Sequence, residues 1–159
     1  MLCFFPGMMV KARQSPQHPV AIGFDVATFY AAFSKNDTDQ LNALLTELNE
    51  TSVPAKEAYE GALLMKKAGL LSKAKEKLKL FKSGREKLEA AIKKDPDNYE
   101  YRFLRLIIQE NVPKIVRYKS NIKEDGALIR SSYKKLPPIV QQAIRDYSKT
   151  SKILNPADF

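Results

Sequence analysis

The stretch KKDPDNYEYRFLRLIIQENVPK, residues 93–114, contains the helix-breaking residues and the apolar pattern that decide the fold. Its two leading lysines suit the negative end of a helix, and Pro96 disfavours helical conformation in the residue before it. Asp97 and Glu100 have the spacing of a capping box, which predicts a new helix start. Residues 93–98 are therefore predicted to form a joint between two helices.

The helix that begins after this joint is predicted to be central. Between Asn98 and Pro113 the apolar residues cover too much of the circumference for a helix with one solvent-exposed side. We therefore expect it to pack against neighbours on more than one side. Its apolar positions are Tyr101, Phe103, Leu104, Leu106, Ile107 and Ile108.

Upstream of this helix, the i, i+3, i+4, i+7 spacing of amphipathic helices recurs. It appears over residues 25–33 and again over residues 41–48, and Asp37 between them is a predicted N-cap. A third helix should open near Pro54, with Gly61 allowing the close approach of a neighbour. The spaced apolar residues are Val26, Phe29, Tyr30 and Phe33, then Leu41, Leu44, Leu45 and Leu48.

A fourth helix is predicted over residues 66–94, and two more over residues 120–136 and 137–147. No alternating strand pattern is present in the sequence. The sequence thus predicts an all-α fold of six to seven helices in antiparallel pairs, forming one domain over residues 24–155. The inward face of the fourth helix should consist of Ala74, Leu78, Phe81, Gly84, Leu88 and Ile92.

Several chemistries lack the residues they need. The 159-residue chain has one cysteine, Cys3, and one histidine, His18. A single cysteine cannot form an internal disulfide, and one cysteine with one histidine cannot form a Cys/His metal cluster within one chain. The sequence also shows no convincing nucleophile–base–acid triad. The scattered glycines form no phosphate-binding loop. We therefore expect no enzyme activity, no cofactor and no structural metal.

The first 23 residues are predicted to be a leader, either disordered or a degenerate export signal. Its basic residues, Lys11 and Arg13, follow the apolar stretch, whereas a secretory signal carries its positive charge first. No apolar run reaches the roughly 20 residues that a membrane-spanning helix needs, so no integral membrane segment is expected. The sequence leaves both a cytoplasmic and an exported or periplasmic location of the protein open.

The net charge of +9 is concentrated in residues 61–94. One interpretation is a solvated helix back kept soluble by lysines. The other is a patch that binds nucleic acid or an anionic surface through residues 66–94, although such patches usually interleave arginines and aromatic residues. The predicted basic patch consists of Lys75, Lys79, Lys82 and Lys93.

The segment GREKLEAAIKKDPDNYEYRFL resembles the junction between consecutive tetratricopeptide repeats, with matching Gly84, Leu88, Ala91 and Pro96. Residues 59–130 also resemble a small bacterial family of tetratricopeptide-like proteins, marked by YEGALLMKKA, DPDNYEYRFLRL and QENVPK. The resemblance implies a right-handed helical array that binds proteins. Members of that family have no assigned activity and often carry an export signal.

The predicted function is a non-enzymatic interaction module with a groove for a peptide or protein partner; the alternative is the basic surface described above. Arg102, Arg105 and Gln109 have the spacing to meet along one helix edge, where the arginines could clamp a partner carboxylate or phosphate. In the structural alternative, the arginines pair with acids of adjacent helices, such as Glu60 or Glu124. The candidate partner-binding residues are Arg102, Arg105, Gln109, Tyr59 and Tyr101.

Overall fold

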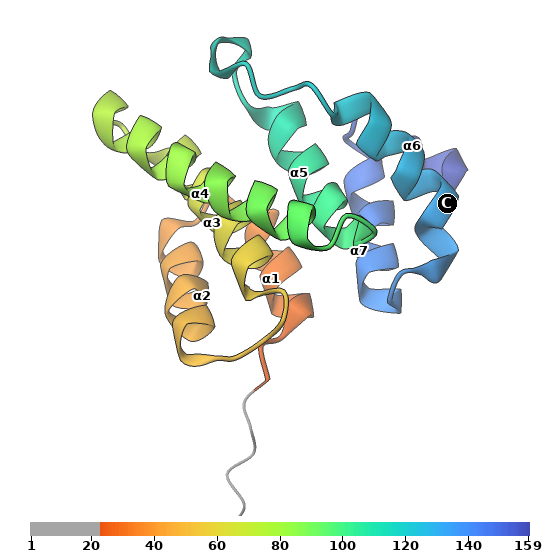
Figure 1. The fold of residues 1–159 in the computed structure, drawn as a ribbon, viewed down its shortest axis with the longest axis horizontal. Coiled ribbons are helices and arrows are strands. Elements are labelled where there is room, and N and C mark those ends of the chain that lie inside the picture. Colours follow the sequence, from red (N-terminus) through yellow and green to blue (C-terminus); the bar gives the residue numbers. More distant parts are fainter. Residues whose placement is uncertain (1–22) are drawn as a thin grey trace, which may run out of the picture.

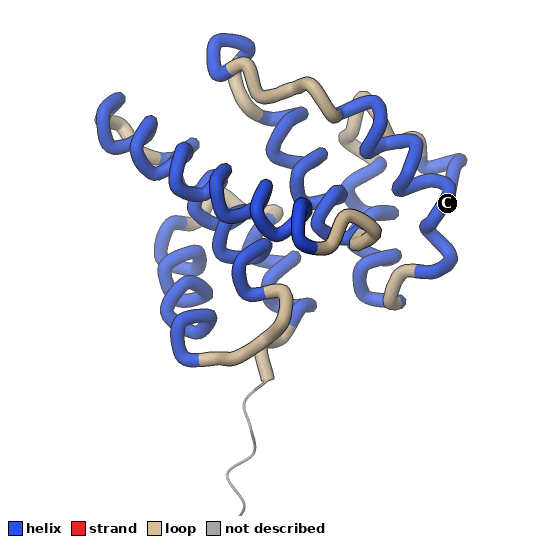
Figure 2. The backbone as a smooth tube through the Cα atoms, in the orientation of Figure 1, coloured by secondary structure: helices blue, strands red, loops and turns tan. Residues whose placement is uncertain are grey.

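The computed structural model describes residues 23–159, and this part of the chain is all helical, with seven α-helices and no strand (Figures 1 and 2). The predicted all-α class and helix number are confirmed. Except for Gly23, the predicted leader lies outside the described residues. Among the helices described, none is both long enough and apolar enough to cross a membrane. In chain order the elements are α1 (Val26–Phe33), α2 (Thr38–Glu50), α3 (Lys56–Leu70), α4 (Ala74–Lys94), α5 (Tyr99–Asn111), η1 (Lys114–Val116), α6 (Ile122–Ser132), η2 (Tyr133–Lys135), α7 (Pro138–Ser148) and η3 (Pro156–Asp158).

Side-chain caps start three of the α-helices. Asp25 caps α1, and Asp37 caps α2 as predicted, each by accepting hydrogen bonds from backbone amides of the first turn. The capping box predicted for α5 is wrong. The N-cap is Asn98, whose side chain accepts from the amide of Tyr101. Glu100 makes no capping bond because its carboxylate accepts hydrogen bonds from two tyrosines of other helices.

α3 and α4 approach each other closely at Gly61 and Gly84. A Cβ atom added to Gly61 would lie 2.7 Å from the carbonyl oxygen of Gly84, and one added to Gly84 would lie 2.6 Å from the carbonyl oxygen of Gly61. Only hydrogen atoms fit between the two backbones at this point. The close approach predicted for Gly61 is confirmed.

α5 is central, as predicted. Leu104 and Ile108 belong to a core shared with α1 to α4, whereas Phe103 and Leu106 belong to a second core shared with α6 and α7. Figure 1 shows α5 lying between these two groups of helices. Because α5 contributes to both cores, it joins the two halves of the described chain.

The start of α4 differs from the prediction. Ala74 and Leu78 were expected to face inward but are exposed, and the first buried residue of this helix is Phe81. The tip of the α3–α4 pair projects past the other helices (Figure 1), so within residues 23–159 no other helix covers the apolar stripe there. The apolar periodicity of α4 therefore extends over its first two turns, where no helix of the described chain packs against the apolar face.

Candidate functional site

Arg102 and Arg105 converge, as their spacing predicted, and they converge on Asp125 of α6. Arg105 is 4% exposed, and its Nε and Nη2 donate to the two carboxylate oxygens of Asp125 at 2.7 and 2.8 Å. Its Nη1 donates to Glu89 of α4 at 2.9 Å. Although burial alone lowers the pKa of Arg105, the hydrogen bonds and charge of Asp125 raise it above its ordinary value. The guanidinium of Arg105 therefore joins α4, α5 and α6.

Arg102 makes a second contact with the same carboxylate, at 3.2 Å. Its Nε donates to the carbonyl oxygen of Pro96 at 2.9 Å, and Glu124 lies 3.8 Å from its Nη1. Glu60, the other acid considered as a partner, pairs with Lys87 instead. The contacts found for both arginines are thus with groups of the chain itself.

The other three candidate residues are also buried. Tyr59 donates to Glu100 at 2.8 Å, and burial raises the pKa of Tyr59. Tyr101 is 6% exposed. Gln109 is fully buried, and neither atom of its side-chain amide has a hydrogen-bond partner among the described residues.

Glu100 joins α5 to α1 and α3. Its Oε1 accepts from Tyr30 at 2.9 Å and from Tyr59 at 2.8 Å. Burial raises the pKa of Glu100, although the two hydrogen bonds act in the opposite direction. Tyr30 also forms part of the groove described next.

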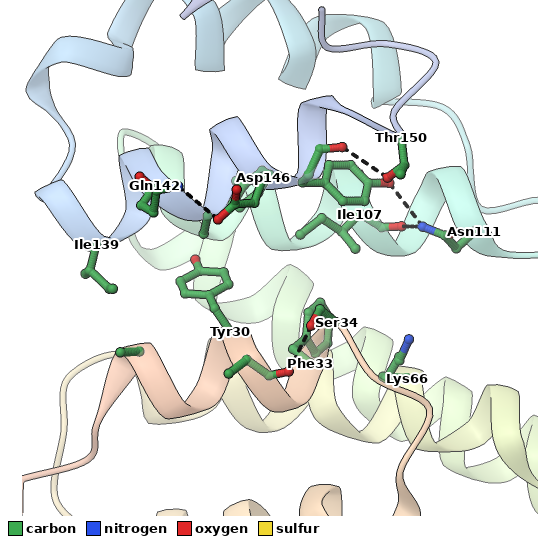
Figure 3. Close-up of a pocket in the computed structure, with 15 residues that line it drawn as sticks. Tyr30, Phe33, Ser34, Lys66, Ile107, Asn111, Ile139, Gln142, Asp146 and Thr150 are labelled. Atoms are coloured by element: carbon green, nitrogen blue, oxygen red, sulfur yellow. Dashed lines mark hydrogen bonds between the residues drawn. The ribbon is translucent and has the colours of Figure 1, made fainter. Parts of the chain in front are cut away.

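A groove of about 570 Å³ lies between α1 and α7 (Figure 3). Three aromatic rings form a row across it: Tyr30 of α1 lies 6.0 Å from Phe103 of α5, which lies 5.9 Å from Tyr147 of α7. Ile107 and Ile139 add aliphatic surface. None of the five candidate partner-binding residues lines this groove. Its full lining is Ala27, Tyr30, Ala31, Phe33, Ser34, Lys66, Phe103, Ile107, Asn111, Ile139, Gln142, Ala143, Asp146, Tyr147 and Thr150.

Lys66 of α3 lies at one end of the groove, near Asn111 and Thr150, whereas Ile139 lies at the other end (Figure 3). The side chain of Lys66 is half-buried, and burial lowers its pKa. Within residues 23–159 it has no ion-pair partner. This end of the groove therefore presents a poorly solvated positive charge beside polar groups.

The sequence did not single out this groove, because its lining residues come from four helices. Residues 27–34 and 139–150 stand more than 100 positions apart, and no spacing rule connects them. The four lysines of the candidate basic patch, Lys75, Lys79, Lys82 and Lys93, are all exposed on α4. In the described part of the chain, no group of three or more His, Cys, Asp or Glu side chains could hold a metal ion.

Comparison with known proteins does not assign the chain to a family. It matches no protein-family model, no curated protein and no solved structure.

Proposed function

We propose that this chain is a non-enzymatic protein-interaction module whose α1–α7 groove binds an apolar peptide segment carrying a carboxylate. The observation that carries the proposal is the half-buried, unpaired Lys66 at one end of an aromatic-floored groove. Burial disfavours the charged form of Lys66, and a carboxylate next to its ammonium group would stabilise that form. The apolar part of the same peptide would cover the aromatic row.

The composition of the groove suits a peptide. Ala31, Ala143 and Ile139 are exposed or partly exposed, and together with the aromatic rings they give the groove an apolar lining. Ligand sites of this type combine an apolar lining with a few polar groups that set orientation. Ser34, Asn111 and Thr150 are polar groups toward the Lys66 end of the groove in Figure 3.

We further propose that the helices form antiparallel pairs in a tetratricopeptide-like right-handed array, with α1–α2, α3–α4 and α5–α6 as the pairs and α7 as the last helix. Two observations support this. α3 and α4 pack closely through their glycines. The groove is lined by every second helix, α1, α3, α5 and α7, as expected where the first helices of successive pairs share one concave surface.

The test uses fluorescein-labelled heptapeptides that alternate leucine and phenylalanine and differ only in the last residue: Asp, Asn or Lys. Fluorescence polarisation should show the Asp peptide binding most tightly and the Lys peptide most weakly. Lys66→Gln should remove the preference for Asp over Asn. The matched control is Lys67→Gln, which changes the same charge on the adjacent residue outside the groove lining.

A second pair of variants tests the location. Ala31→Trp fills the groove and should weaken all three peptides, whereas Ala127→Trp, at an exposed position of α6, should not. Circular dichroism checks that both variants fold. The proposal fails if none of the peptides binds, or if Ala31→Trp binds them as tightly as the original protein does.

A further inference from the structure

Three large apolar side chains are exposed in the described chain: Leu78, Ile115 and, to a smaller extent, Ile139. Ile139 belongs to the groove. Leu78 of α4 is 69% exposed, and Ile115 of η1 is 88% exposed. Neither has a role in the proposed peptide site. Single exposed apolar residues are common on proteins, so their surroundings decide whether they matter.

An aromatic contact joins the segments that carry Leu78 and Ile115. Tyr118, which follows η1, packs edge-to-face on Phe81 of α4 at 5.9 Å, and Arg85 lies 4.6 Å from the centre of the same ring. Leu78 stands three residues before Phe81, and Ile115 stands three residues before Tyr118. The contact between the two rings therefore brings the start of α4 close to the segment that follows η1, and in Figure 1 both the tip of α4 and the loop after α5 project beyond the other helices.

The surroundings of both residues are strongly basic. Residues 73–82 and 114–119, which we call the basic edge, carry eight basic side chains and one acidic side chain, Glu76. Glu76 pairs with Lys73 at 3.2 Å, and no other ion pair involves these side chains among the described residues. The basic side chains are Lys73, Lys75, Lys77, Lys79, Lys82, Lys114, Arg117 and Lys119.

We propose that the basic edge docks on an anionic lipid bilayer, with Leu78 and Ile115 inserting among the acyl chains and the lysines contacting the headgroups. Clustered lysines and arginines are attracted by the surface potential of anionic lipids, and their long side chains can bury apolar stems while the charges stay in water. Exposed aliphatic side chains next to such charges gain by leaving water at the membrane interface.

A bilayer accounts for more of the basic edge than a nucleic acid does. The basic side chains of the edge could contact the phosphates of either a lipid or a nucleic acid. Proteins that bind single-stranded nucleic acids, however, also present exposed aromatic rings on which the bases stack. Here the aromatic residues, Phe81 and Tyr118, are buried against each other, and the exposed apolar groups are aliphatic. Insertion into a bilayer would bury Leu78 and Ile115, whereas contacts with nucleic acid phosphates would leave them in water.

The experiment is co-sedimentation of the full chain with vesicles of phosphatidylcholine alone or with about one-third phosphatidylglycerol. Binding should require the anionic lipid and fall as salt is added. Leu78→Ala and Ile115→Ala should each weaken binding about threefold or more, as expected when inserted apolar surface is lost. Ile139→Ala is the control, since it shortens an exposed isoleucine of α7 that lines the groove and is not part of the basic edge, and it should bind vesicles like the original protein.

The charges are tested in the same way. Replacing Lys75 and Lys79 by Gln should weaken binding to anionic vesicles, whereas replacing Lys134 and Lys135 of η2 should have a smaller effect. The proposal is overturned if vesicle binding ignores lipid charge, or if Ile115→Ala and Leu78→Ala bind as tightly as the original protein. Salt-sensitive binding of an RNA or DNA duplex that is unchanged by Ile115→Ala, with no binding to vesicles, would also overturn it and assign the edge to nucleic acid.

Discussion

The carboxylate of Asp125 is fully buried and forms ion pairs with two arginines, Arg102 and Arg105. Buried ion pairs balance a large desolvation cost against their mutual attraction. Removing Arg105 would leave the buried carboxylate of Asp125 with one weaker partner, Arg102, which makes a single contact at 3.2 Å. Breaking this buried ion pair should therefore lower the free energy of unfolding more than breaking an ion pair at the surface.

Arg105→Ala should lower the free energy of unfolding by about 3 to 5 kcal/mol, because Asp125 would lose its bidentate partner. Urea unfolding measures the change. The control is Arg130→Ala, which removes a partly exposed arginine 3.9 Å from Asp158 and should cost about 1 kcal/mol or less. Equal losses for the two variants would contradict the enclosed pair. If Arg105 were instead a partner clamp, its replacement would leave stability unchanged.

The second prediction concerns Glu100, whose pKa burial raises above its ordinary value of 4.5. The folded protein holds this proton more tightly than the unfolded chain does. The contribution of Glu100 to stability is therefore fully present below pH 4.5 and is lost as the pH rises through the higher pKa of the folded state. Glu100→Gln keeps an acceptor for Tyr30 and Tyr59 and cannot ionise.

We expect Glu100→Gln to remove this part of the pH dependence, so that its stability relative to the original protein improves as the pH rises from 4.5 toward neutrality. Thermal unfolding across this range measures the difference. A difference between the two proteins that does not change with pH would show that Glu100 titrates alike in the folded and unfolded states.

At the scale of the elements, the pairing of α3 with α4 depends on two glycines. Gly84→Ala would place a methyl group 2.6 Å from the carbonyl oxygen of Gly61, so the two helices would have to move apart. Overpacking of this kind costs about 1 to 3 kcal/mol. The loss should appear in urea unfolding.

Gly69→Ala is the matched control in α3. A Cβ atom added to Gly69 meets nothing within 4 Å, so the higher helix propensity of alanine should raise stability by up to about 1 kcal/mol. Opposite signs for the two substitutions are the expected result. A destabilised Gly69→Ala together with a neutral Gly84→Ala would contradict the observed packing.

At the scale of the whole molecule, α5 links two hydrophobic cores. Leu104 in the first core and Leu106 in the second are both fully buried, and replacing either by Ala should cost about 2 to 5 kcal/mol. Because the two cores share one helix, we expect them to unfold together. Far-UV circular dichroism and tyrosine fluorescence should give coincident transitions for both variants.

Leu78→Ala is the control for this pair, since an exposed leucine should contribute less than about 0.5 kcal/mol. Two separate transitions in Leu106→Ala would show that α6 and α7 melt independently of the first core.

Sequence alone determined the fold class, the central place of α5 and the close approach at Gly61. Each of these follows from local chemistry: the 3.6-residue period, the position of breakers such as Pro96, and the absence of a side chain on glycine. It also placed Arg102 and Arg105 on one edge. Spacing along one helix is fixed by the geometry of that helix, so these statements need no knowledge of its neighbours.

Only the tertiary structure decided what each of these faces meets. Asp125 binds Arg105 because α6 packs against α5. Glu100 does not cap α5 because its carboxylate accepts hydrogen bonds from Tyr30 and Tyr59. The exposure of Leu78 depends on where the neighbouring helices stop. The groove forms only because residues 27–34 and 139–150, which are distant in the sequence, lie on opposite sides of it in the folded protein. Periodicity shows which side of a helix is apolar, but burial and ligand space are set by the packing of segments that are distant in the sequence.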